Sequence, residues 1–218
     1  YSNKALAKSI HRKFGFNVLE NVKVPQSGKN YVVKSCVGSG SVGIHFIKGD
    51  ALKTDDVPTD KFVEEAQNFS EYFGISGVAI NGTLLFLYSH KRVVTKDKFG
   101  GASRVCKKTK LDLTLSKKVK NFICDEGYTG CFMFEFGRTK DDIVLIELNS
   151  RLWGSFPLAE RHFKKLVSNS FSKCRIRERH TPNFVFYLHL KSFNFLIINF
   201  KQLRHNVYLS PSLKIFSN

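Results

Sequence analysis

Two glutamates stand inside the most apolar stretches of the chain, and their placement constrains the fold more than any other feature. Glu135 follows Cys-Phe-Met-Phe and Glu147 follows Ile-Val-Leu-Ile, so each lies in a run that otherwise indicates a buried β-strand. The residues Arg-Thr-Lys-Asp between the runs predict a turn. If the turn centres near Asp141, the strands form a hairpin with Glu135 directly opposite Glu147.

Paired carboxylates of this kind favour a divalent cation. Two carboxylates about 5 Å apart on one sheet face repel each other, and burial costs more unless a positive charge is present. Asn149 has the same parity as Glu147 and adds an amide oxygen. Oxygen ligands suit Mg²⁺ or Mn²⁺ rather than Zn²⁺. Glu135, Glu147 and Asn149 are therefore predicted metal ligands, and Arg151, one same-parity step on, is a candidate cation for an anionic group.

A polar hairpin facing solvent is the alternative interpretation, because isolated glutamates are common on exposed strands. Strand alternation argues against it, since it places apolar side chains on the same face as the glutamates. The expected neighbours on that face are Cys131, Met133, Ile143 and Leu145.

Two Ser/Gly segments are candidate phosphate loops. In VVKSCVGSGSVGI (32–44), Lys34 ends a strand and can neutralise a phosphate, while glycines and serines that follow offer backbone and hydroxyl donors. KFGGASR (98–104) is a second such loop with flanking cations. The first segment matches neither a P-loop nor a dinucleotide-binding fingerprint, and a plain connector is its alternative. The second segment is an equally weak signal when taken alone.

The remaining pattern predicts an α+β fold with antiparallel strand pairs and few helices. A helix over 3–16 should bury one face and stop at Gly15; its expected buried residues are Leu6, Ile10 and Phe14. A helix over 115–127 should end at Gly127 and turn Val119, Phe122 and Ile123 inward. Strands are expected at 31–34, at 44–47, near the end of 57–67, and in a hairpin over 76–94 that turns at Asn81-Gly82.

The charge distribution narrows the choice of partner. The formal net charge of +17 suggests a polyanion, but residues 160–218 hold 11 of the 35 basic residues and only 2 of the 18 acidic ones. A nucleic-acid-binding protein driven by this Lys/Arg/Phe-rich tail is one hypothesis, although the tail shows no recognised nucleic-acid module. The body is only moderately basic, as a binder of small anions could be.

Location and membrane association follow from the cysteines and the apolar runs. Five widely spaced cysteines without a CxxC pair indicate reduced thiols and a cytoplasmic protein. The run 184–200 approaches the length of a membrane span but contains His189 and Lys191, so no membrane association is expected.

Taken together and in order, the motifs resemble the ATP-grasp superfamily, most closely the carbamoyl-phosphate-synthase-like branch of carboxylate–amine ligases. The resemblance covers about residues 3–160. Its most specific part is Glu-x-Asn-x-Arg-x-Trp-Gly-Ser after an apolar strand. The matching stretches are VVKSCVGSGSVGI, FVEEA, HKRVVTKDKFGGASR, GYTGCFMFEF and LIELNSRLWGSFPLA.

The resemblance implies two α+β lobes with antiparallel sheets that sandwich ATP. It implies a first lobe over 1–66 with the phosphate loop and hinge, a second over 67–165 with the metal site, and a basic Phe-rich tail of unassigned structure over 166–218. By resemblance, Lys34 contacts ATP phosphates and Arg151 steadies the transferred group, so both are implied catalytic residues. The remaining implied ATP and substrate contacts are Ser39, Gly40 and Ser41 in the loop, Glu64, Glu65 and Ala66 at the hinge, Glu71 at the ribose, and Gly100, Gly101 and Ser103 at phosphate or substrate.

The implied activity is an ATP- and Mg²⁺- or Mn²⁺-dependent ligation of a small-molecule carboxylate to an amine through an acyl phosphate. The identities of both substrates and the oligomeric state stay open. Enzymes of this family usually carry an N-terminal α/β domain before the first matched helix, and this sequence has no counterpart of it. A nucleotide-binding module without turnover is therefore the alternative function.

Overall fold

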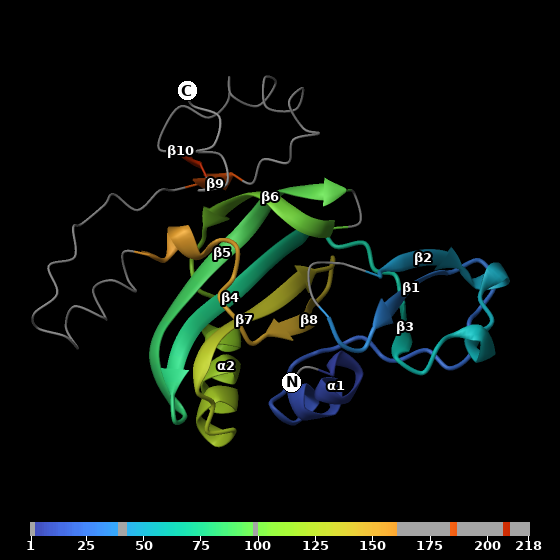
Figure 1. The fold of residues 1–218 in the computed structure, drawn as a ribbon, viewed down its shortest axis with the longest axis horizontal. Helices are drawn as coiled ribbons and strands as arrows, with labels where there is room; N and C mark the ends of the chain where they lie inside the picture. The colour runs from blue at the N-terminus through green and yellow to red at the C-terminus, as the bar shows by residue number, and fades with distance from the viewer. Residues whose placement is uncertain (1–2, 39–42, 98–99, 161–183, 187–206, 210–218) are drawn as a thin grey trace, which may run out of the picture.

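The computed structural model describes residues 3–38, 43–97, 100–160, 184–186 and 207–209. These residues form two mainly antiparallel sheet regions with a helix packed against the larger sheet and a second helix below the junction between the two regions (Figure 1). In chain order the helices and strands are α1 (Lys4–Lys13), β1 (Asn30–Ser35), β2 (His45–Lys48), β3 (Lys61–Glu65), β4 (Glu71–Ile80), β5 (Thr83–Asp97), β6 (Gly100–Lys108), α2 (Leu113–Asp125), β7 (Gly130–Arg138), β8 (Ile143–Asn149), β9 (Phe184–Phe186) and β10 (Val207–Leu209). This arrangement confirms the predicted α+β class.

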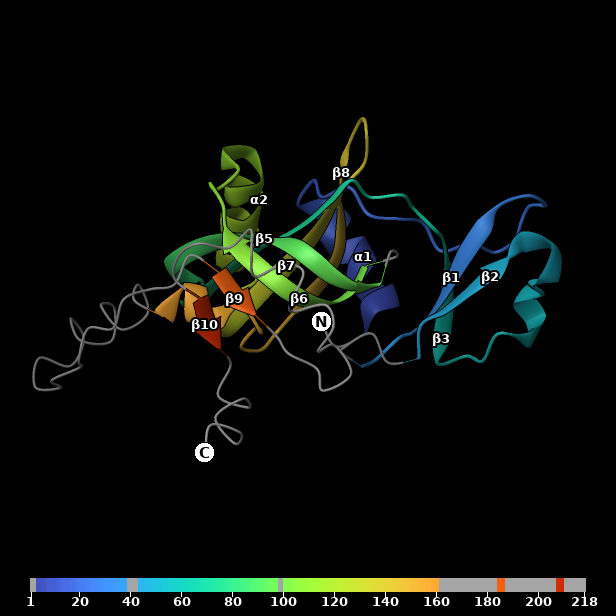
Figure 2. The same cartoon turned by 90° about the horizontal axis from the view of Figure 1, so that it is seen from above.

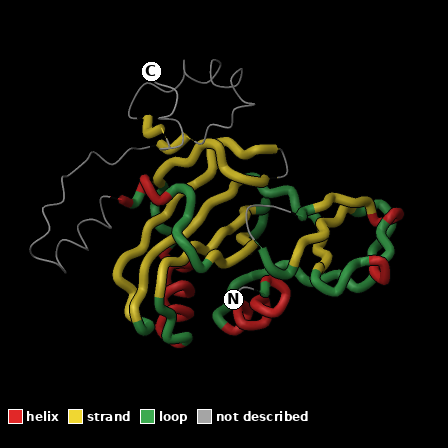
Figure 3. The backbone as a smooth tube through the Cα atoms, viewed as in Figure 1, coloured by secondary structure: helices red, strands yellow, loops and turns green. Residues whose placement is uncertain are grey.

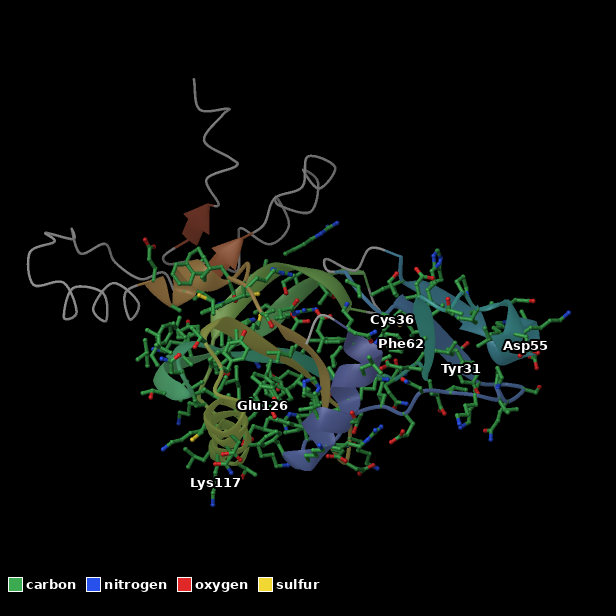
Figure 4. All side chains as sticks on the ribbon, turned by 60° about the horizontal axis from the view of Figure 1, so that its bottom comes forward. Tyr31, Cys36, Asp55, Phe62, Lys117 and Glu126 are labelled. Atoms are coloured by element: carbon green, nitrogen blue, oxygen red, sulfur yellow. The ribbon has the colours of Figure 1, made fainter. Side chains whose placement is uncertain are left out.

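The smaller sheet has the order β2-β1-β3, with both pairs antiparallel. Short 3₁₀ turns at Gly49–Ala51 and Thr54–Asp56 connect β2 to β3 at the tip farthest from the larger sheet (Figure 3). The sheet has its own apolar core, which consists of Tyr31, Val33, Leu52 and Val63. Figure 4 shows Cys36 and Phe62 at the end of this sheet that meets the rest of the molecule, with Asp55 at its tip.

The larger sheet has the order β10-β9-β6-β5-β4-β7-β8, and α2 covers one of its faces (Figure 2). The predicted inward residues of α2, namely Val119, Phe122 and Ile123, are all 0% exposed. They pack against the three phenylalanines of β7, Phe132, Phe134 and Phe136. Gly127, just past the C-terminus of α2, has φ +55°, so the predicted glycine stop is confirmed.

Helix α1 begins at an asparagine cap, since the side-chain oxygen of Asn3 accepts hydrogen bonds from two amides of the first turn. It ends before Gly15, as expected. The predicted apolar face is wrong at Leu6, which is 70% exposed, because the helix turns Lys8 and His11 toward the protein interior. Burial of charged and polar groups on this face was not expected from an apolar periodicity.

The β4–β5 hairpin turns at Asn81-Gly82, as predicted. Both residues have positive φ, +46° and +74°, which is the conformation of a type I′ turn. Strand β5 continues to Asp97 and pairs with β6. The interpretation of 98–104 as a loop is wrong for residues 100–104, which lie in β6 and pair with β5 through an irregular register. The Ser/Gly composition of this segment is unusual for a strand and therefore gave no strand signal.

The β7–β8 hairpin contains a β-bulge. Glu135 pairs with Glu147, as predicted, but Phe136 pairs with Leu145, so Ile146 is an extra residue on β8. The bulge reverses the strand parity. The expectation that Ile143 and Leu145 share the face of the glutamates is therefore wrong, and both instead contact the core beneath α2.

Candidate functional site

A cavity of about 120 Å³ lies where the smaller sheet, α1 and the larger sheet meet. Five predicted site residues line it together: Lys34, Glu64, Glu65, Glu135 and Glu147. The other residues in its wall are Lys4, Leu19, Val32, Ile44, Phe46, Phe62, Gln67, Phe69, Tyr72, Arg92 and Ile146. Segments from residue 4 to residue 147 thus meet around one space.

The carboxylate pair lies on the inner wall of this cavity. Glu135 and Glu147 are cross-strand partners, and their side chains are only 14% and 18% exposed. Asn149 Nδ2 donates a hydrogen bond to Glu147 Oε1 at 2.9 Å. The three predicted metal ligands are therefore adjacent. Their donor set of carboxylate and amide oxygens fits Mg²⁺ or Mn²⁺. Among the described residues, no group of three or more His, Cys, Asp or Glu side chains is arranged to hold a metal ion.

Two cations that sequence reasoning missed compensate the pair. Lys4 Nζ lies 2.9 Å from Glu147 Oε2, and Arg92 forms an ion pair with Glu135. Burial raises the pKa of Glu135, and the neighbouring Glu147 adds to this while Arg92 opposes it. Burial also acts to raise the pKa of Glu147, but Lys4 and Asn149 more than offset it, so that this pKa is lowered. Glu147 is thus the carboxylate that stays ionised more readily.

A second charge cluster centres on Glu64, which also lines the cavity. Glu64, 3% exposed, forms ion pairs with Lys34 and with Lys8, whose Nζ lies 2.6 Å from Glu64 Oε1. Burial would raise the pKa of Glu64, but the two lysines lower it below its usual value. Burial lowers the pKa of Lys8 despite Glu64. The side chain of Glu64 is therefore held as a structural anion between the predicted phosphate-binding Lys34 and the helix α1.

One sequence signal could have revealed the α1 lysines. Lys4 and Lys8 are four residues apart, so they lie on the same side of the helix. Lys8 also neighbours Ala7 and His11, both of which are buried. A lysine on a buried helix face needs a carboxylate partner to offset the cost of burying its charge. This pattern could have predicted that α1 packs against a cluster of charged side chains.

Several predicted site residues lie elsewhere. Arg151 is exposed and donates from Nη1 to the carbonyl oxygen of Leu152 at 3.2 Å, outside the cavity wall. Glu71 forms ion pairs with Lys91 and Arg138, at 2.9 and 3.3 Å. Their predicted contacts with substrate groups gain no support from this geometry.

Other predicted residues lie at the edge of the site or beyond it. The amide of Ala66 donates to Asn30 O at 2.8 Å, so this amide is already bonded to β1 of the smaller sheet. Gly100, Gly101 and Ser103 lie in β6, and Ser103 is not in the cavity wall. Ser39, Gly40 and Ser41 lie outside the described residues.

No protein-family model matches the sequence, and no curated protein matches it. Solved structures do match. The biotin carboxylase domain of Hydrogenobacter thermophilus 2-oxoglutarate carboxylase, in complex with MgADP and bicarbonate, is 13% identical with a TM-score of 0.60 and covers 84% of this chain. N5-carboxyaminoimidazole synthetase from Staphylococcus aureus, complexed with ADP, is 16% identical with a TM-score of 0.53 and covers 72%.

A third match is the L-amino acid ligase from Bacillus licheniformis, 18% identical with a TM-score of 0.51 over 71% of this chain. The matched regions make up 49%, 46% and 42% of the three proteins, so the chain spans about half of their length. No helix of the described part is long and apolar enough to cross a membrane. With its two mainly antiparallel sheets and these structural matches, the chain has the ATP-grasp fold.

Proposed function

We propose that the chain is the nucleotide-binding core of an ATP- and Mg²⁺-dependent ligase that joins a small-molecule carboxylate to an amine. The observation that carries this proposal is the cavity between the lobes, which is lined both by the paired carboxylates of β7 and β8 and by Lys34 of β1. Structural neighbours crystallised with ADP or MgADP support the choice of nucleotide.

The walls of the cavity fit the parts of a nucleotide. Val32, Phe62, Phe69 and Ile146 offer apolar surface on which a nucleobase can pack. Lys34 and Lys4 offer positive charge for phosphates. Glu135, Glu147 and Asn149 would hold the Mg²⁺ or Mn²⁺, which when bound neutralises phosphate charge. We place Glu64, Glu65 and Ala66 at the hinge beside the base, because Glu64 and Glu65 end β3 and Ala66 directly follows it, where the chain passes between lobes.

The proposed chemistry proceeds through an acyl phosphate. A substrate carboxylate oxygen attacks the γ-phosphorus of ATP, the bond to the β,γ-bridging oxygen breaks, and ADP leaves. An amine then attacks the acyl carbon and displaces inorganic phosphate, losing one proton. The chain positions the reactants and neutralises charge, and it needs no nucleophilic side chain.

A test begins with ADP and ATP binding to the full chain in the presence of Mg²⁺, measured by calorimetry. Hydroxylamine then traps acyl phosphate as a hydroxamate while a panel of carboxylates is screened. Glu147→Gln should make nucleotide binding independent of Mg²⁺, and it should form no hydroxamate. Glu20→Gln is a matched control, because Glu20 lies on an exposed segment with a side chain 76% exposed. Hydroxamate formation at the wild-type rate by Glu147→Gln contradicts the metal assignment.

A nucleotide-binding module without turnover is the second candidate, favoured by the position of Arg151 outside the cavity wall. This candidate predicts MgADP binding with no hydroxamate from any carboxylate. Hydroxamate formation from one carboxylate would exclude it.

A further inference from the structure

The proposed metal ligands are already bonded to cations supplied by other elements. Lys4 Nζ, from the first turn of α1, lies 2.9 Å from Glu147 Oε2, and Arg92, from β5, pairs with Glu135. The four side chains all line the same cavity. The carboxylates are therefore neutralised before any divalent cation arrives.

We propose that Lys4 makes this site selective for a metal–polyphosphate complex over the free divalent cation. This inference rests on the proposed function. It adds a specificity role that the carboxylates alone would not provide, since two adjacent carboxylates without a counter-charge would attract any divalent cation.

Charge repulsion explains the selectivity. A free divalent cation that binds Glu147 must displace the ammonium of Lys4, which then remains beside a doubly charged ion with no new partner. When phosphates enter with the cation, the displaced ammonium can turn to a phosphate oxygen in the same cavity. Glu147 and Lys4 then each keep a partner of opposite sign, so the complex enters without leaving the Lys4 ammonium unpaired.

The placement of Lys4 suits such an exchange. Its backbone amide donates to Cys36 O at 2.7 Å, and Asn3 caps the helix turn that carries it, so its backbone is anchored to the end of β1. Its side chain is 23% exposed and the partner side chain of Glu147 is 18% exposed, so the ion pair borders open space. A long side chain on a fixed base can change partners without a change of fold.

The experiment measures two affinities on each variant of the full chain by calorimetry: Mn²⁺ alone, and ADP with saturating Mg²⁺. Lys4→Met should bind Mn²⁺ alone about tenfold more tightly than the wild type and MgADP about tenfold more weakly. Lys13→Met is the matched control on the same helix, because Lys13 is exposed and outside the cavity wall. Both of its affinities should stay within about twofold of the wild type.

The double variant Lys4→Met/Glu147→Gln tests where the Mn²⁺ binds, and it should lose the tenfold gain. Circular dichroism confirms that each variant is folded. If wild type and Lys4→Met bind Mn²⁺ equally well and both still bind MgADP, the selectivity inference is wrong. The proposed nucleotide site would not be contradicted by this result. A folded wild type that does not bind MgADP overturns both this inference and the proposed function.

Discussion

Replacement of His11 by phenylalanine should make the fold less sensitive to acid. His11 is 4% exposed, and its ring centroid lies 6.3, 5.9 and 6.4 Å from those of Phe16, Phe122 and Phe134. Its Nε2 has no hydrogen-bond partner among the described residues. Burial among these rings lowers the pKa of His11 from 6.5 to about 4.

The sign and size of the effect follow from proton linkage. Well above pH 6.5 the imidazole is neutral in both the folded and the unfolded chain, and it adds no pH dependence. Below pH 6.5 the unfolded chain binds a proton that the folded chain does not, so the free energy of unfolding decreases as the pH is lowered. His11 lowers the free energy of unfolding by about 3 kcal/mol by pH 4, and about 2 kcal/mol of this decrease occurs between pH 7 and pH 5.

Urea denaturation at pH 7 and pH 5 measures this loss directly. His11→Phe should lose about 2 kcal/mol less than the wild type over this interval. His45→Phe is the control, since His45 is exposed on β2 and its replacement should leave the loss unchanged. Equal losses in wild type and His11→Phe would refute the reasoning, because His11 would then titrate alike in both states.

Three further predictions concern stability, each read as the free energy of unfolding in urea. Glu64→Gln should cost about 3 kcal/mol because it leaves Lys8 buried without its counter-charge, and a cost below about 1 kcal/mol would contradict the buried ion pair. Gly82→Ala should cost more than about 2 kcal/mol, because Gly82 has φ +74° and its new Cβ would lie 2.8 Å from a backbone oxygen of α2. Gly28→Ala is the control and should cost only about 1 kcal/mol, because Gly28 has a similar φ of +77° but open space around it. Equal costs would show that the close contact with α2 adds nothing to the cost at Gly82. Phe134→Ala, at 0% exposure, should cost about 3–5 kcal/mol, and a loss within 1 kcal/mol would place this ring outside the core.

Local patterns in the sequence predicted most of the elements of the fold. Asn81-Gly82 specifies its turn because both residues tolerate positive φ, and Gly127 stops α2 for the same reason. The inward face of α2 could be read from helical periodicity. These features depend on neighbours within a few residues, which the sequence displays directly.

The bulge at Ile146 was not predictable from alternation. The run Ile-Val-Leu-Ile-Glu-Leu-Asn is apolar on both strand faces, so it contains no signal that marks an extra residue. The predicted pairing of Glu135 with Glu147 was nevertheless correct. The turn is centred half a residue before the predicted position at Asp141, and the extra residue of the bulge compensates for this shift at Glu147. Residues 100–104 show the converse case, in which Ser/Gly composition indicated a loop but pairing with β5 forms a strand.

The counter-charges of the site were the hardest part to predict because they come from distant segments. Lys4 reaches Glu147 across 143 positions of sequence, and Arg92 reaches Glu135 across 43. Such pairs form only once the lobes and α1 are assembled, and no local period encodes them. The prediction could specify that the paired carboxylates need positive charge, but it assigned that charge to a metal alone.

The structure shows that the protein supplies much of this charge itself, and this changes how affinity should arise. The cavity wall contains Lys4, Lys34 and Arg92 beside four glutamates, so ligand entry exchanges ion pairs instead of neutralising bare charge. An exchange between paired states gains little net energy, because the pairs that form replace pairs that break. In the proposed nucleotide site, we expect affinity to come chiefly from apolar contacts with the base. We therefore expect nucleotide affinity to depend weakly on salt, whereas a site with bare cations would lose affinity steeply as salt rises.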